Sequence, residues 1–201
     1  MLGAIILAGG ASSRMGADKA SLEWAGQAAV DRVAATALAA GAALLVTAGG
    51  PDRGYPHVAD VDQGGGPVGG LMAGAAHLKQ AGADRVLVLA VDAPTIHPED
   101  LSPLIALNSA PAAAYVGLHL PLVIAIDALP AEAEAGWSVR QVLDCAGVVR
   151  LNPPEGVAAR LRGANTPEER DALLAELLAE TEQDRTTAPA PAAGGPAKPG
   201  K

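Results

Sequence analysis

The chain has 201 residues, half of them hydrophobic, and a formal net charge of −8. This length suits one domain, and the acidic charge argues against binding to duplex nucleic acid, which needs a basic face. With only two Trp, two Tyr and no Phe, the chain also lacks the aromatic surface on which single-stranded nucleic acids stack.

Predicted strands and helices alternate through the first half of the chain. The apolar run at 2–8 ends in two glycines, which predicts a buried strand followed by a loop. An Ala-rich segment with Gly41 as its C-cap predicts the first helix. We expect strands at 2–8, 43–48, 57–61 and 86–91, and helices at 28–40, 68–80 and 98–107. This alternation predicts an α/β fold with a single doubly wound, mostly parallel sheet and helices on both faces.

Shorter elements are predicted in the second half. Thr166 is a candidate N-cap of the last helix, with Glu169 at the capping-box position. From residue 181 the composition shifts to Ala, Pro, Gly and Thr, which cannot bury enough surface to become ordered. We expect strands at 112–116, 122–126 and 148–151, helices at 139–143 and 167–180, a domain at 1–180 and a disordered tail at 181–201.

The segment after the first strand carries the most information about function. Residues 7–19 read Leu-Ala-Gly-Gly-Ala-Ser-Ser-Arg-Met-Gly-Ala-Asp-Lys. Two glycines let the backbone approach a ligand closely, at the strand end where parallel sheets bind their ligands. The backbone N–H groups of such a loop can bind an anion, and Arg14 and Lys19 add two cations suited to a polyphosphate. The alternative from these residues alone is a surface turn with solvated cations.

Asp92 is the second candidate, because it ends the apolar strand at 86–91 and precedes Ala93-Pro94. A carboxylate at this strand end is expected to point into the ligand crevice. Mg²⁺ binds one or two carboxylates together with phosphate oxygens and water, so one aspartate suffices. A turn or helix-capping aspartate is the alternative that the residue itself leaves open.

The loop at 7–19 resembles the signature loop of sugar-nucleotide and cofactor nucleotidyltransferases, and its Ser-Ser-Arg-Met-Gly-Ala-Asp-Lys form is closest to molybdenum cofactor guanylyltransferases. The resemblance implies an enzyme that transfers GMP from GTP to the phosphate of molybdopterin, releases pyrophosphate and forms the guanine dinucleotide form of the cofactor. It implies Mg²⁺ as cofactor. The catalytic residues that it implies are Lys19, Arg14 and Asp92, and the nucleotide contacts in this loop are Leu7, Ala8, Gly9, Gly10 and Lys19.

Further site residues follow from the same resemblance. Asn165, in Asn-Thr-Pro-Glu-Glu, is expected to join Asp92 as a metal ligand. The glycine run at 64–69 resembles the family's Gly-Pro loop over the nucleotide, and we reject its formal match to a dinucleotide-binding motif because the strand before it is short and polar. The other implied nucleotide contacts are the acids Asp60 and Asp62 before that run, Asp92, and Thr47, where the family often has Asn. His119 is either a pterin contact or a plain loop residue.

The expected location is the cytoplasm, since the single cysteine, Cys145, permits no internal disulfide. The apolar start is too short for a membrane span. The expected partners are GTP, molybdopterin and molybdoenzyme maturation proteins, with no nucleic acid and no membrane. The alternatives are a molybdopterin cytidylyltransferase, another Mg²⁺-dependent nucleotidyltransferase with a small phosphorylated substrate, and a non-catalytic nucleotide-binding regulator.

Overall fold

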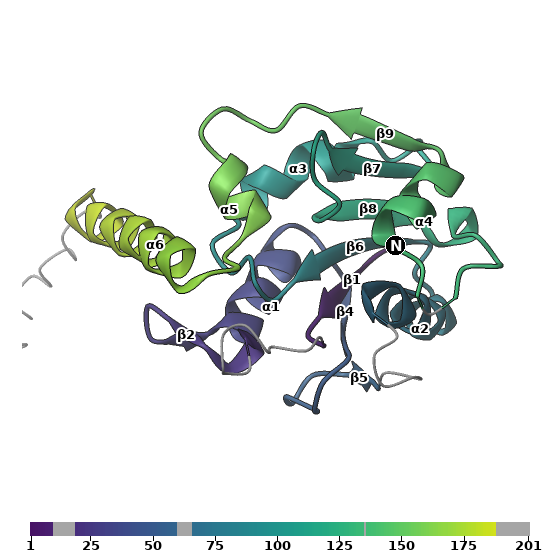
Figure 1. The fold of residues 1–201 in the computed structure, drawn as a ribbon, viewed down its shortest axis with the longest axis horizontal. Coiled ribbons are helices and arrows are strands. Elements are labelled where there is room, and N and C mark those ends of the chain that lie inside the picture. The colour runs from purple at the N-terminus through teal and green to yellow at the C-terminus, as the bar shows by residue number, and fades with distance from the viewer. Residues whose placement is uncertain (10–18, 60–65, 135, 188–201) are drawn as a thin grey trace, which may run out of the picture.

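One mixed sheet forms the centre of the computed structural model, which describes residues 1–9, 19–59, 66–134 and 136–187. Its strands are β1 (Leu2–Leu7), β4 (Leu44–Ala48), β5 (His57–Val58), β6 (Arg85–Ala90), β7 (Ala112–Tyr115), β8 (Leu122–Ala125) and β9 (Val148–Leu151). They lie in the order β5-β4-β1-β6-β8-β7-β9 (Figure 1). Only β8 is antiparallel to its neighbours in this sheet, which confirms the predicted mostly parallel α/β fold.

Helices cover both faces of the sheet, as predicted. The central strand β1 is apolar on both sides, and its residues Ala4, Ile5 and Ile6 are fully buried, as expected where two helical layers enclose a parallel strand. The helices α1 (Ala29–Ala39) and α3 (Pro98–Ala106) pack on one face, and α2 (Gly66–Gln80) and α4 (Val139–Ala146) on the other. This sheet places the ends of β1 and β6 side by side, which positions the site described below.

The remaining elements are η1 (Lys19–Ser21), β2 (Glu23–Trp24), β3 (Gln27–Ala28), η2 (Ile126–Ala128), α5 (Ala158–Arg162) and α6 (Pro167–Thr187). Figure 1 shows α6 beside the hairpin that contains β2. The short turn η2 follows β8 and lies where β6 begins, since Ile126 N donates to Asp84 O. Sequence periodicity did not predict the β2–β3 hairpin or α5, because elements of two to five residues are too short to show a period.

Several helices begin or end at other residues than predicted. Helix α2 begins at Gly66 rather than at residue 68, and α4 continues to Ala146, where Gly147 adopts the left-handed conformation that ends many helices. Helix α6 continues through Thr187. The last helix therefore ends later than the predicted residue 180, because residues 181–187 still contain helix-forming Glu, Gln and Arg. The domain boundary at 180 and the disordered tail stay predictions. Residues 188–201 lie outside the described part.

None of the helices in the described part of the chain is both long enough and apolar enough to cross a membrane.

Candidate functional site

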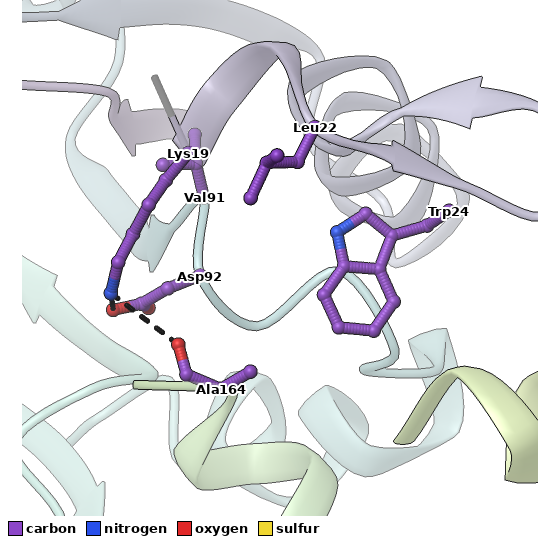
Figure 2. A pocket seen from close by; sticks show the side chains of 6 residues that line it. All are labelled: Lys19, Leu22, Trp24, Val91, Asp92 and Ala164. Atoms are coloured by element: carbon purple, nitrogen blue, oxygen red, sulfur yellow. Dashed lines mark hydrogen bonds and ion pairs between the residues drawn. The ribbon is translucent and has the colours of Figure 1, made fainter. Parts of the chain in front are cut away.

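The site lies where β1 and β6 end. Val91 continues beyond β6 and its N–H donates to the carbonyl of Leu7, so Asp92 lies next to the end of β1. The Asp92 side chain is 29% exposed and faces a small pocket (Figure 2). The pocket is lined by Lys19, Leu22, Trp24, Val91, Asp92 and Ala164. The predicted carboxylate therefore points into a hollow at the carboxyl edge of the sheet.

Lys19 gathers three oxygen atoms around its ammonium group. Its Nζ lies 3.4 Å from Asp92 Oδ2, 3.3 Å from the main-chain oxygen of Ala164 and 3.3 Å from Asn165 Oδ1. An ammonium group has three N–H donors, so this cluster can engage all of them. The structure thus brings together Lys19, Asp92 and Asn165, which sequence analysis assigned to one site although they lie far apart in the chain.

Gly163 explains how Asn165 reaches this cluster. Its φ of +72° is in the left-handed region, and a Cβ at this position would lie 2.2 Å from the main-chain oxygen of Asp92. The next residue, Ala164, donates its N–H to that same oxygen over 2.8 Å. A side chain at position 163 would force the two segments apart. The close backbone contact therefore positions the following residue, Asn165, beside Asp92 and Lys19.

The start of α6 holds Asn165 from the other side. Glu169 Oε2 accepts hydrogen bonds from the backbone N–H groups of Asn165 and Thr166 over 2.8 and 3.2 Å, and Glu169 N donates to Thr166 Oγ1. This arrangement is the predicted capping box. It leaves the exposed Asn165 side chain available for the cluster while fixing its backbone.

The charge of Asp92 is only partly compensated. Burial raises the pKa of the Asp92 carboxyl, while the positive charge of Lys19 and its hydrogen bond act in the opposite direction without cancelling the effect. The long contact of 3.4 Å explains why, because a charge-assisted hydrogen bond is normally shorter than 3 Å. A second cation close to this carboxylate would stabilise its ionised form.

The oxygen atoms around Lys19 fit a magnesium ion. A carboxylate, a side-chain amide oxygen and a main-chain carbonyl are hard ligands of the kind that Mg²⁺ prefers, and the Lys19 ammonium shows that they already converge on one cation. Within the described residues, no group of three or more His, Cys, Asp or Glu side chains could hold a metal. Mg²⁺ needs only one or two carboxylates from a protein when phosphate oxygens and water complete its ligands.

The predicted nucleotide contacts Leu7, Ala8 and Gly9 lie at the end of β1 and do not line the pocket. Leu7 and Ala8 are buried and Gly9 is exposed, and Ala8 N donates to Ala48 O over 2.8 Å. Gly50 has a φ of +69°, and a Cβ there would lie 3.0 Å from Ala8 O. The backbone at Ala8 is therefore tightly packed against β4 and the turn at Gly50, and Gly9 is the first exposed residue after β1.

Other predicted contacts are not brought to the pocket. Thr47 is fully buried, and its hydroxyl contacts Pro56 O at 3.3 Å and His57 Nδ1 at 3.1 Å. These contacts hold β4 against β5 rather than present Thr47 to a ligand. His119 is exposed and does not line the pocket. The predicted contacts Gly10, Arg14, Asp60 and Asp62 lie outside the described residues.

Sequence analysis missed several residues that build the pocket. Leu22 and Trp24 form its apolar wall, and Ala164 contributes a main-chain oxygen that no side-chain pattern reveals. Two signals were present: Trp24 is one of only two tryptophans, and Gly163 directly precedes the Ala-Asn-Thr-Pro segment. Both residues could have been selected as structurally unusual, although neither indicates its partner.

Sequence comparisons with known proteins agree on one family. The family described as "MobA-like NTP transferase domain" matches residues 4–144. A protein of Xanthomonas euvesicatoria named "Molybdenum cofactor guanylyltransferase" is 32% identical over 180 residues, covering 86% of this chain and 94% of that protein.

Solved structures confirm the fold. A nucleotidyl transferase from Methanothermobacter thermautotroptrophicus superposes with a TM-score of 0.70 at 16% identity, over 90% of this chain and 99% of that one. Molybdopterin-guanine dinucleotide biosynthesis protein A from Archaeoglobus fulgidus gives 0.63 at 19% identity, over 90% of this chain and 100% of that one. At such identities the likeness concerns the arrangement of the sheet and helices.

Proposed function

The chain belongs to the family of MobA-like NTP transferase domains, and from this premise we propose that it is a molybdenum cofactor guanylyltransferase. It transfers GMP from GTP to the phosphate of molybdopterin, releases pyrophosphate and forms the guanine dinucleotide form of the cofactor. The observation that carries the proposal is the convergence of Lys19, Asp92 and Asn165 on one point at the carboxyl edge of the sheet.

The reaction needs positioned charges rather than a covalent intermediate. An oxygen of the molybdopterin phosphate attacks the α-phosphorus of GTP, the bond to the β-phosphate oxygen breaks, and pyrophosphate leaves. Asp92 and Asn165 would hold Mg²⁺, which would supply positive charge to the phosphates when bound. Lys19 and Arg14 neutralise the charge that develops on the transferred and departing groups. Positioning and electrostatic stabilisation of this kind account for most of the rate of phosphoryl-type transfers.

Lys19 has two roles in this proposal. Without ligands, its ammonium partly compensates the charge of Asp92. Mg²⁺ requires the same oxygen atoms, and two cations close together repel each other. With Mg²⁺ and a nucleotide bound, Asp92 and Asn165 would hold the metal, and the Lys19 ammonium would turn from Asp92 to the triphosphate. This cation exchange would bring the positive charge of Lys19 to the reacting phosphates only when metal and nucleotide are both present.

The proposal includes the surroundings that the resemblance implies. GTP and molybdopterin are the substrates, and molybdoenzyme maturation proteins are further partners. The location is cytoplasmic, which agrees with a chain whose single cysteine cannot form an internal disulfide.

Nucleotide-dependent stabilisation tests the proposal. We would measure the melting temperature of the protein with GTP, CTP, ATP or UTP, each with and without Mg²⁺. A ligand at one hundred times its Kd stabilises a protein by about 2.7 kcal/mol. We expect the largest shift with GTP and Mg²⁺, lost in Asp92→Asn and kept in Asp127→Asn, a matched change in an exposed ion pair. A larger shift with CTP would replace the proposal by cytidylyl transfer, and no shift with any nucleotide would contradict it.

A further inference from the structure

A third apolar cluster, separate from the two that cover the sheet, joins the two walls of the pocket. It consists of Trp24, Ala29, Ala164, Leu173 and Leu177, with Leu22 and Leu174 packed against it. Leu22 and Trp24 follow Lys19 closely in sequence, whereas Leu173 and Leu177 belong to α6, which begins just after Asn165. The cluster therefore connects the segment that carries Lys19 with the segment that carries Asn165.

Trp24 lies at the centre of this connection. It is 2% exposed, yet its indole borders the pocket, as Figure 2 shows. The guanidinium of Arg170, from α6, lies 5.9 Å from the centre of the ring, within the range of a cation–π interaction. Arg170 Nη2 also donates to Glu23 O over 3.3 Å. The hairpin and α6 are thus tied by packing, by a cation–π contact and by a hydrogen bond.

The connection limits the directions in which α6 can leave the pocket. Asn165 is exposed, and its side-chain oxygen lies 3.3 Å from Lys19 Nζ. The contact of Gly163 and Ala164 with the Asp92 backbone fixes one end of this segment. It does not by itself fix the direction in which α6 leaves. The docking of α6 on Trp24 supplies that second constraint.

We propose that Trp24, covered by Arg170, is a positioning residue for the cation site, and that it acts by holding Ala164 and Asn165 opposite Lys19 and Asp92. The inference rests on the proposed function, because it assigns a support to the same site. Residues that support metal ligands in this way typically change metal affinity or activity by about ten- to a hundredfold when they are replaced.

The test is a titration of the full chain with Mn²⁺ in the absence of nucleotide, with free Mn²⁺ followed by electron paramagnetic resonance. We expect Trp24→Ala to weaken Mn²⁺ binding by about tenfold, and Trp24→Phe to restore most of the affinity, because an aromatic ring can still pack against α6. The matched control is Trp137→Ala, a tryptophan that packs partly buried against another cluster; its Mn²⁺ affinity should stay at the wild-type value.

The Mg²⁺ dependence of GMP transfer distinguishes a weakened cation site from a loss of folded protein. In Trp24→Ala, the Mg²⁺ concentration for half-maximal rate should rise by about tenfold, while KM for GTP at saturating Mg²⁺ stays close to the wild-type value. In Trp137→Phe, Trp24 is the only tryptophan left, and its fluorescence should change as Mg²⁺ and GTP bind. Unchanged emission together with an unchanged Mg²⁺ requirement in Trp24→Ala would overturn the inference.

A second variant covers the case in which Trp24→Ala does not fold. Arg170→Met keeps the apolar stem but removes the guanidinium over Trp24, and we expect a smaller loss of Mn²⁺ affinity in the same direction. Arg140→Met, in an exposed pair with Asp144, is its control. An Mn²⁺ affinity of Arg170→Met equal to that of Arg140→Met would overturn the inference. If the wild-type protein bound Mn²⁺ but transferred no GMP, the proposed function would fail while the positioning role of Trp24 could still hold.

Discussion

Two aspartates that follow β6 differ in how tightly each is paired with a cation of the protein. Asp92 contacts Lys19 at 3.4 Å, whereas Asp100 binds Arg160 through two hydrogen bonds of 2.7 and 2.8 Å. Both pairs are largely buried; the first connects the segment after β6 with η1 near the N-terminus, and the second connects it with α5. The first is loose and borders the pocket, while the second is a two-point guanidinium–carboxylate contact of the strong kind.

The pKa values of the two carboxyls express this difference. Burial raises the pKa of Asp92, and Lys19 only partly opposes the effect. Burial acts in the same direction on Asp100, but hydrogen bonds from Arg160 and the His97 backbone outweigh it and hold its pKa below the usual range. Asp100 therefore has the partners it needs within the protein and stabilises the fold. Asp92 lacks a partner of this strength, which fits its proposed role as a ligand of an external cation; shifted pKa values are common among functional groups.

The matched replacement Asp92→Asn should have the largest effect on activity. It removes the negative charge that binds the metal while preserving size and shape, and we expect kcat for GMP transfer to fall by about a thousandfold, as for loss of a preorganised charge partner. The measurement is formation of pyrophosphate with GTP and molybdopterin, with Asp127→Asn as control. A fall of less than tenfold would remove Asp92 from the mechanism.

The same replacement at Asp100 should act on stability instead. Asp100→Asn leaves Arg160 without its carboxylate, and breaking a buried pair costs about 3 kcal/mol of unfolding free energy. Urea unfolding followed by circular dichroism measures this loss, and kcat per folded molecule should change by less than about threefold. Asp92→Asn should shift the unfolding free energy by less than about 1 kcal/mol, as is usual for a loose ion pair. Equal losses in the two variants would erase the distinction between the pairs.

The sheet could be predicted because its central strands, β1 and β6, are long apolar runs in the sequence. The site was predictable only in part. A glycine-rich turn and an aspartate after buried strands indicate a ligand edge, but no spacing tells that Asn165 meets Lys19 across the fold. That meeting depends on Gly163 and on α6 docking against Trp24, and such contacts between distant segments leave no periodic signal. The resemblance supplied what the pattern could not.

Thr47 shows a second limit of prediction from sequence. Its position near the end of β4 suggested a ligand contact, yet its hydroxyl contacts Pro56 O and His57 Nδ1 and so links β4 to β5. A position at a strand end does not reveal whether a polar side chain points toward the ligand or bonds to the neighbouring strand.

Replacement of Lys19 should separate metal binding from catalysis. In Lys19→Met, the competing ammonium is gone, and we expect Mn²⁺ to bind about tenfold more tightly without nucleotide, a difference of about 1.4 kcal/mol, while GMP transfer falls strongly. Electron paramagnetic resonance of free Mn²⁺ measures the affinity, and Lys79→Met, from the exposed pair with Asp127, is the control. Weaker Mn²⁺ binding in Lys19→Met would contradict the proposed cation exchange.

The pH dependence of stability should have opposite signs at the two aspartates. Because the folded pKa of Asp100 is lowered, its stabilising contribution is present above the pKa of an unfolded aspartate and is lost as pH falls through the lowered value. Because the folded pKa of Asp92 is raised, its contribution favours folding at acid pH and is lost as pH rises through the raised value. Unfolding free energies of the wild type minus those of each Asn variant, measured at several acid pH values, should therefore slope in opposite directions; parallel slopes would contradict the assignment.

The most direct measurement of the central claim is identification of the product by mass spectrometry. The purified full chain would be incubated with molybdopterin, Mg²⁺ and an equal mixture of GTP, CTP, ATP and UTP, with Asp92→Asn treated in parallel. We predict that the wild type forms the guanine dinucleotide of molybdopterin and pyrophosphate, and that Asp92→Asn forms almost none. Formation of the cytosine dinucleotide instead, or no dinucleotide at all from protein that binds GTP, would contradict the assignment as a guanylyltransferase.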